Sequence, residues 1–187
     1  ENGGLSRPED YGQFALQCKE QYGYPAFKIH GWIGAPIERE VSAVQAIRDA
    51  VGDNMAIMLD PAGAYNPFDD VLRVGRACDE AHYFWYEDAF RGGGFSSFAH
   101  TKLRHFIETP LLMGEHVRGL EQKADTIHAG AADYVRASAG ADGDVTEPNE
   151  VEPSTTQPVV STESNDTVGV QRETREFSEE REYAIQF

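Results

Sequence analysis

Three carboxylic acids, Asp60, Glu87 and Glu115, stand at nearly equal intervals along this chain of 187 residues. Each follows a short apolar run, directly or after one glycine, and the interval is close to one strand–helix repeat of an α/β barrel. An acid at the C-terminal tip of consecutive parallel strands points into the mouth of such a barrel. Three converging carboxylates repel one another unless a cation lies between them, and hard oxygen ligands suit Mg²⁺. The pattern therefore predicts a magnesium site.

Two basic residues precede this series by one strand. Lys28 and His30 lie two positions apart in the short strand predicted for residues 26–30, so their side chains share one face of it. Beside three acids, such groups can hold or accept a proton, and a neutral imidazole accepts one near physiological pH. An ordinary exposed strand end is the alternative interpretation of this pair, and the carboxylate series favours the catalytic one.

The chain alternates helical and apolar extended segments, beginning with a helix. The strands are short and apolar without alternation, which is typical of parallel strands covered on both faces. A flavodoxin-like open sheet shares this order of elements, but chemistry at the tip of every strand favours a barrel. The predicted strands cover residues 26–30, 55–59, 83–86, 111–113 and 133–137. The predicted helices cover residues 6–21, with Ser6 as N-cap of a capping box, and residues 38–50, 68–80, 97–106 and 120–129.

The length of the chain limits how much of a barrel it can form. A complete eight-stranded α/β barrel usually needs about 250 residues. We therefore expect an α/β fold, a partial (β/α)8 TIM-type barrel, over residues 1–146. Residues 147–187 are rich in acids, Pro, Ser and Thr and have no helical or strand periodicity, so we predict a disordered acidic tail there.

The charge balance argues against several classes of partner. The formal net charge of −16 disfavours binding to nucleic acid or to an anionic membrane surface. No apolar run approaches the ~20 residues that span a bilayer, and no signal peptide is visible. Cys18 and Cys78 have no CxxC partner, so we predict free thiols and a cytoplasmic protein. The 12 arginines against four lysines resemble the bias of halophilic proteins, with an ordinary acidic cytoplasmic protein as the alternative.

Four stretches of the sequence together resemble the enolase superfamily, specifically its mandelate racemase and muconate-lactonizing branch. They are Phe27–Trp32, Met58–Pro61, Trp85–Asp88 and Met113–Glu115. The order and spacing of the stretches carry the likeness, which covers residues 6–146. The resemblance implies that the chain contains about strands 2–6 of the C-terminal barrel domain of that family.

The resemblance also implies a reaction. Asp60, Glu87 and Glu115 would bind one Mg²⁺, which chelates a substrate carboxylate and stabilises the enediolate formed when the neighbouring proton is removed. Lys28 and His30 would be the catalytic pair, with His30 as base and Lys28 as electrostatic partner, or with the roles exchanged. A Lys-x-His pair looks more like the acid-sugar dehydratases of this branch than its racemases. The expected function is therefore loss of water from an acid sugar, a small-molecule carboxylate, in carbohydrate acid catabolism.

Several family features are missing from the sequence. Ser138 stands where the family has an Asp at the end of the sixth strand, and we find no first, seventh or eighth strand and no capping domain. With the start at Glu1, these losses predict a truncated fragment with impaired or no activity. Five parallel strands cannot close a barrel, so the alternative is a non-catalytic interaction protein that forms a homo-oligomer or pairs with a complementing chain. A racemase or cycloisomerase is the further alternative within the superfamily, and the particular acid sugar is left open.

Overall fold

A computed structural model describes residues 5–31, 35–91, 96–115, 117 and 119–136. Within these residues the chain forms a parallel sheet in the strand order β1-β2-β3-β4-β5, with a helix before each strand. The strands are β1 (Ala26–His30), β2 (Ala56–Asp60), β3 (Trp85–Glu87), β4 (Leu111–Met113) and β5 (Tyr134–Val135). The helices are α1 (Pro8–Tyr22), α2 (Ile37–Val51), α3 (Phe68–Glu80), α4 (Ser97–Arg104) and α5 (Leu120–His128).

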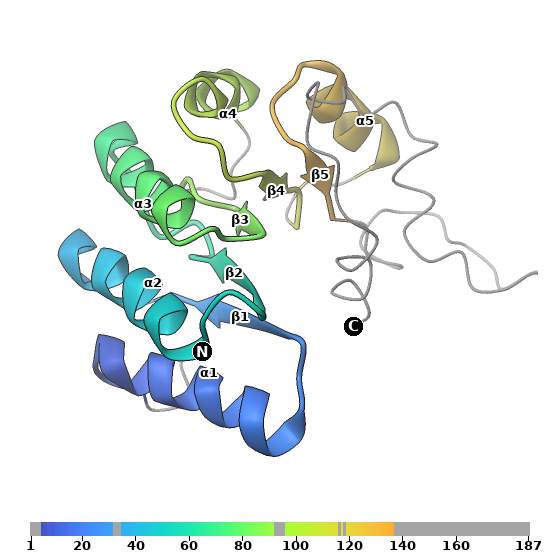
Figure 1. Cartoon of the computed structure of the whole chain (residues 1–187). Coiled ribbons are helices and arrows are strands. Elements are labelled where there is room, and N and C mark those ends of the chain that lie inside the picture. Colours follow the sequence, from blue (N-terminus) through green and yellow to red (C-terminus); the bar gives the residue numbers. More distant parts are fainter. Residues whose placement is uncertain (1–4, 32–34, 92–95, 116, 118, 137–187) are drawn as a thin grey trace, which may run out of the picture.

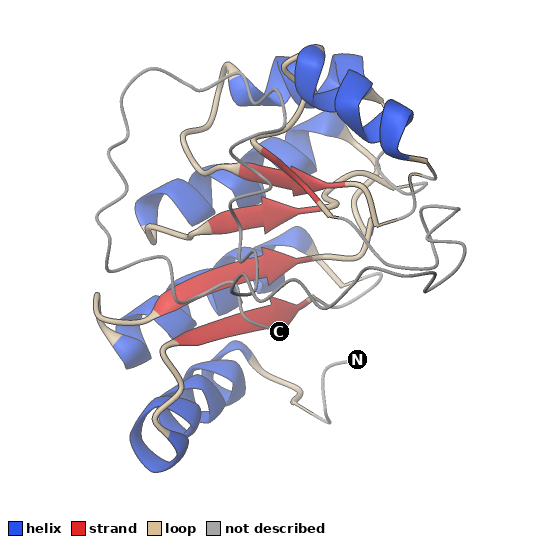
Figure 2. Ribbon diagram, turned by 90° about the vertical axis from the view of Figure 1, so that its right-hand side faces the viewer, coloured by secondary structure: helices blue, strands red, loops and turns tan. Residues whose placement is uncertain are grey.

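The strand order separates a barrel wall from a flavodoxin-like sheet. Every described strand pairs in parallel with the next strand in the sequence, from Ala26↔Ala56 in the first pair to Met113↔Val135 in the last. A flavodoxin-like sheet reverses its order at a switch point, whereas the wall of a barrel does not. The helices lie along one face of the curved sheet (Figure 1), and the strands run side by side in one direction (Figure 2). The prediction of a partial TIM-type barrel is confirmed.

The face of the sheet that meets the helices carries the main apolar core. Successive residues of a strand point to opposite sides, so alternate positions of each strand enter this core. Ile29, Leu59 and Tyr86 are fully buried there and pack with Val44 of α2 and Val74 of α3. Burying several such side chains, each contributing about 1.5–3 kcal/mol, fixes the strands against the helices. The packing against the helices thereby fixes the position of the strand tips.

The opposite face of the sheet has a smaller apolar cluster around Met58, Phe84 and Trp85. Met58 and Trp85 are register partners in neighbouring strands. Asp60 and Glu87 each lie two residues further along the same strands and so share their face. The alternation of the strands therefore carries both carboxylates to the face away from the helices, at the C-terminal tips.

Several predicted boundaries differ from the observed ones by one or two residues, and two of the differences have a clear local cause. The helix predicted from Ser6 begins at Pro8, with Arg7 as N-cap, because the Asp10 carboxylate accepts the Arg7 backbone N–H at 2.9 Å. The third strand begins at Trp85 rather than at Tyr83, since the Tyr83 N–H donates back to the carbonyl of Cys78 at the end of α3. In both cases a backbone N–H forms a local hydrogen bond, Arg7 with Asp10 and Tyr83 with Cys78, and this local bond shifts the start of the element.

Other predictions concern features away from the sheet. Cys18 and Cys78 are free, as predicted, and both are buried. Among the described helices, none combines the length and the apolar character needed to cross a membrane. The tail predicted for residues 147–187 lies outside the described residues, as does Ser138.

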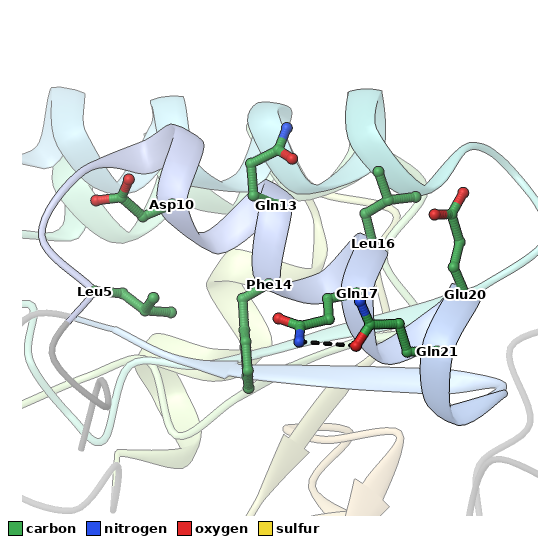
Figure 3. A pocket seen from close by; sticks show the side chains of 8 residues that line it. All are labelled: Leu5, Asp10, Gln13, Phe14, Leu16, Gln17, Glu20 and Gln21. Atoms are coloured by element: carbon green, nitrogen blue, oxygen red, sulfur yellow. Dashed lines mark hydrogen bonds between the residues drawn. The ribbon is translucent and has the colours of Figure 1, made fainter.

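A shallow hollow of about 610 Å³ lies on the exposed side of α1 (Figure 3). Apart from Leu5, its lining residues all belong to this one helix. Phe14 is 43% exposed there, and Gln17 donates a hydrogen bond to Gln21 at 3.0 Å. None of the predicted site residues lines it, so the hollow is a helix surface and not the predicted reaction site.

Candidate metal centre

The three predicted carboxylates come together at the strand tips. Asp60 ends β2, Glu87 ends β3, and Glu115 follows β4 after the single residue Gly114. Each offers an oxygen, and the three oxygens lie within 4.8 Å of one another. Asp60 and Glu87 are buried, whereas the side chain of Glu115 is 38% exposed. This arrangement of hard oxygen donors can hold a metal ion.

Lys28 reaches into the same cluster. Its Nζ donates to Asp60 Oδ2 at 2.9 Å and to Glu87 Oε2 at 3.0 Å. The other Asp60 oxygen, Oδ1, accepts the backbone N–H of Ala62 at 2.9 Å. Asp60 is thus fixed from both sides, by a backbone turn and by an ammonium group.

His30 lies at the tip of the same strand, on the same face as Lys28. It is the register partner of Asp60, and the half-buried residue is held in place because its carbonyl accepts the Tyr11 hydroxyl at 3.4 Å. The strand therefore brings Lys28 into direct contact with the carboxylates and sets His30 opposite Asp60 in the register of the sheet.

Arg136 is a site residue that the sequence analysis missed. Its Nη1 donates to Glu87 Oε1 at 3.2 Å and lies 3.4 Å from Glu115 Oε2. Arg136 directly follows β5, so it occupies the same tip position as the acids on the preceding strands. That position in the strand–helix repeat is the signal that could have identified it.

Burial and charge shift the proton affinities in this cluster. Burial and the neighbouring Asp60 carboxylate raise the pKa of Glu87, although Lys28 and Arg136 oppose the shift. Burial alone would lower the pKa of Lys28, but the contacts with Asp60 and Glu87 outweigh it and raise the pKa. Lys28 therefore keeps its proton at neutral pH. Burial likewise raises the pKa of Asp88, the residue after Glu87.

The charges leave room for a further cation. Three carboxylates face two permanent cations, so the ionised cluster carries an excess negative charge. Like charges brought together in a partly buried site are unfavourable, and a divalent ion between them relieves the repulsion. The donor set and its charge therefore both fit a hard metal ion.

Comparison with known proteins identifies the family. Residues 10–151 match the family described as enolase C-terminal domain-like. A D-gluconate/D-galactonate dehydratase of Picrophilus torridus is 27% identical over 148 residues, which is 73% of this chain and 36% of that protein. An N-succinyl-L-Arg/Lys racemase of Bacillus cereus is 25% identical over 131 residues, which is 70% of this chain and 34% of that protein. The chain thus spans about a third of the length of these curated relatives.

A solved structure gives the same result for the fold. The D-glucarate dehydratase of Agrobacterium tumefaciens, crystallised with magnesium, superposes with a TM-score of 0.64 at 30% identity, covering 73% of this chain and 36% of that one. The relatives include dehydratases and racemases, and the family match covers most of the chain. This chain therefore belongs to the enolase C-terminal domain-like family, in the branch of mandelate racemase and the acid-sugar dehydratases.

Proposed function

We propose that the chain binds Mg²⁺ through Asp60, Glu87 and Glu115 and removes water from an acid sugar. The observation that carries the proposal is the convergence of these carboxylates, from three successive strand tips, within 4.8 Å of one another. When bound, the ion would chelate the substrate carboxylate and stabilise the negative charge that develops as the neighbouring proton leaves. The dehydratases among the relatives, one of them crystallised with magnesium, support this proposal.

The two basic residues divide the proton chemistry between them. Lys28 keeps its proton, because its contacts with Asp60 and Glu87 raise its pKa, so it serves as an electrostatic partner. His30, on the same face of β1, is the base that takes the proton next to the substrate carboxylate, giving an enediolate. The imidazolium then gives this proton to the departing hydroxyl, so that water leaves and the ring is neutral again.

Turnover is expected to be slow. Lys28, Glu115 and Arg136 are 27%, 38% and 40% exposed, so water reaches the carboxylates from one side. Water weakens each electrostatic contact that would stabilise developing charge. Exposure of the cluster to water is therefore expected to limit the rate of turnover.

Racemisation is the second candidate, because an N-succinyl-L-Arg/Lys racemase is among the relatives. It needs a proton donor or acceptor on each side of the reacting carbon. Lys28 and His30 both stand on β1, and Arg136 is a basic side chain that contacts the cluster from the β5 side. A guanidinium stays protonated and does not act as a base, which favours dehydration over racemisation.

The test is an assay of the full chain with D-gluconate, D-galactonate and D-glucarate in the presence of Mg²⁺. Formation of 2-keto-3-deoxy acids, lost on addition of EDTA and in Asp60→Asn, would support the proposal. Exchange of the α-proton of N-succinyl-L-arginine in D₂O, without loss of water from the sugars, would instead support racemisation.

A non-catalytic interaction protein is the candidate from another class. β1 and β5 are the edge strands of the described sheet, and an edge strand has backbone groups that can pair with a second copy or a complementing chain. No product and no proton exchange, together with a discrete oligomer in sedimentation, would favour this candidate over an enzyme.

A further inference from the structure

Asp88 lies between the second and third carboxylates of the candidate metal centre. It directly follows Glu87, is only 2% exposed, and has a backbone φ of 36°, in the left-handed region that side chains other than Gly, Asn and Asp rarely adopt. Such a conformation costs of order 1–3 kcal/mol and persists where the surroundings fix it. Hydrogen bonds of both the main chain and the side chain of Asp88 hold this conformation.

The main chain of Asp88 connects two neighbouring segments. Its N–H donates to the carbonyl of Leu112 in β4 at 3.1 Å. Its carbonyl accepts the N–H of Gly63 at 2.7 Å, in the loop that follows Asp60. The backbone N–H and carbonyl of this one residue therefore tie the loop after β2 to the strand that leads to Glu115.

The side chain of Asp88 adds a third connection. Its Oδ1 accepts the N–H of Gly114, the residue just before Glu115, at 3.1 Å. Gly114 has a φ of 110°, a turn that only glycine adopts without strain, and this turn directs the chain away from β4. The Asp88 carboxylate thus holds the turn from which Glu115 reaches the other two acids.

We propose that Asp88 is a positioning residue of the metal centre, which sets the third carboxylate, Glu115, relative to Asp60 and Glu87. Asp88 does not contribute one of the three clustered oxygens and acts through the peptide of Gly114. This inference rests on the proposed function, because it concerns the affinity of the same cluster for a divalent ion. Partners that orient metal ligands typically affect affinity by about 10- to 100-fold.

The chain offers a matched control at the other end of β4. The Asp79 carboxylate accepts the backbone N–H groups of Glu108 at 2.9 Å and Thr109 at 2.6 Å, just before that strand. Asp79 and Asp88 therefore each accept backbone N–H groups at one end of β4. Only Asp88 lies at the tip that carries the carboxylates.

The experiment measures Mn²⁺ binding to the full chain by the electron paramagnetic resonance signal of the free ion. Asp88→Gly removes the carboxylate while tolerating the positive φ, and it is expected to weaken Mn²⁺ binding by about 10- to 100-fold. Asp88→Asn keeps an oxygen acceptor and tolerates this backbone, so its affinity should stay within about threefold of the wild type. Asp79→Ala should lower the thermal midpoint and leave the affinity for Mn²⁺ within about twofold.

Unchanged Mn²⁺ affinity in Asp88→Gly, or equal weakening in Asp79→Ala, would overturn the proposal. A wild-type chain that binds no Mn²⁺ would refute the proposed function instead. In that case hydrogen exchange at the Gly114 amide decides the positioning role. Faster exchange in Asp88→Gly than in Asp79→Ala supports the role, and equal rates in the two variants refute it.

Discussion

Lys28 offsets part of the negative charge of the carboxylate cluster, as a bound metal ion would also do. Its ammonium contacts two of the three carboxylates, and Arg136 contacts Glu87 and Glu115. Removing the cationic partner of a buried carboxylate leaves an unpaired negative charge in the interior, and this destabilises the folded state. The same side chain is therefore expected to matter for stability as well as for chemistry.

Replacing Lys28 with Met should lower the free energy of unfolding by about 1–3 kcal/mol in EDTA, because Asp60 and Glu87 lose their ammonium partner. Saturating Mg²⁺ should recover part of the loss. Urea unfolding with and without Mg²⁺ measures both effects.

The control for Lys28→Met is Arg73→Met. Arg73 forms an ion pair with Glu38 in which both side chains are mostly exposed, and such pairs contribute at most about 1 kcal/mol. Equal losses in the two variants, or no recovery with Mg²⁺, would contradict the role assigned to Lys28.

Stability without metal should fall as the pH rises from about 4.5 towards neutrality. Burial and Asp60 raise the pKa of Glu87 above its ordinary value of 4.5, so the folded chain binds more protons than the unfolded chain in this range. The pKa of Asp88 is raised as well, chiefly by burial, and acts with the same sign. The raised pKa of Lys28 affects stability only in the alkaline range, above about pH 10.4.

Thermal midpoints measured in EDTA between pH 4.5 and neutrality test whether stability falls as the pH rises. Glu87→Gln should flatten the decline, whereas Glu9→Gln, on the exposed first turn of α1, should not change it. Added Mg²⁺ should stabilise the wild type more at neutral than at acidic pH, because the ion binds ionised carboxylates. A midpoint that rises steadily with pH in EDTA would contradict the burial argument for Glu87.

At the scale of elements, local patterns predict most of the fold. β1 and β4 have the predicted bounds, because each is a short segment between a proline and a glycine, Pro25 and Gly31 around β1 and Pro110 and Gly114 around β4. The convergence of the acids was also predictable, since it needs only the strand–helix repeat and a parallel sheet. The predicted metal ligands Asp60, Glu87 and Glu115 lie in one cluster, and Lys28 contacts it. The roles of these residues stay predictions.

Contacts between elements were not predictable from the same patterns. Arg136 contacts Glu87 and Glu115 because β5 pairs beside β4, and the strand predicted for residues 133–137 placed this residue inside the strand and not at its tip. The links from Asp88 to Gly63 and Gly114 depend on backbone directions that the sequence does not display. The strand pattern fixes which residues share an edge, whereas side-chain and peptide contacts across that edge require the tertiary structure.

The packing of α1 on α2 depends on the absence of a side chain at Gly12. A Cβ at this position would lie 2.6 Å from the carbonyl oxygen of Ala46, a backbone atom of α2. Alanine gains about 1 kcal/mol in helix propensity over glycine, but forcing two helices apart costs about 1–3 kcal/mol. We expect Gly12→Ala to be destabilising on balance, as measured by the urea midpoint.

Gln13→Ala is the control for this helix contact, since Gln13 is exposed on the same helix. Its effect should stay within about 0.5 kcal/mol, as for most surface substitutions. Gly12→Ala with a midpoint equal to or above that of the wild type would show that the helices adjust without cost, and that α1 is not held by close contact.

At the scale of the whole molecule, the acidic balance acts on stability independently of the metal centre. The chain carries a formal net charge of −16. Charges of one sign repel through solvent over the Debye length, which is about 30 Å at 0.01 M salt and about 10 Å at 0.1 M. Self-repulsion of this kind opposes the compact state, and it weakens as salt is added.

We therefore expect the thermal midpoint in EDTA to rise by several degrees between about 0.01 M and 0.3 M KCl, and to rise equally in NaCl. An equal response to both salts identifies screening, because screening depends on ionic strength and not on the cation. A flat or falling midpoint would mean that the acids are already neutralised by nearby partners such as those around Glu87. Above about 1 M the Debye length is near 3 Å and screening is complete, so a midpoint that continues to rise there requires a further salt effect, as the halophilic interpretation of the arginine-rich composition predicts.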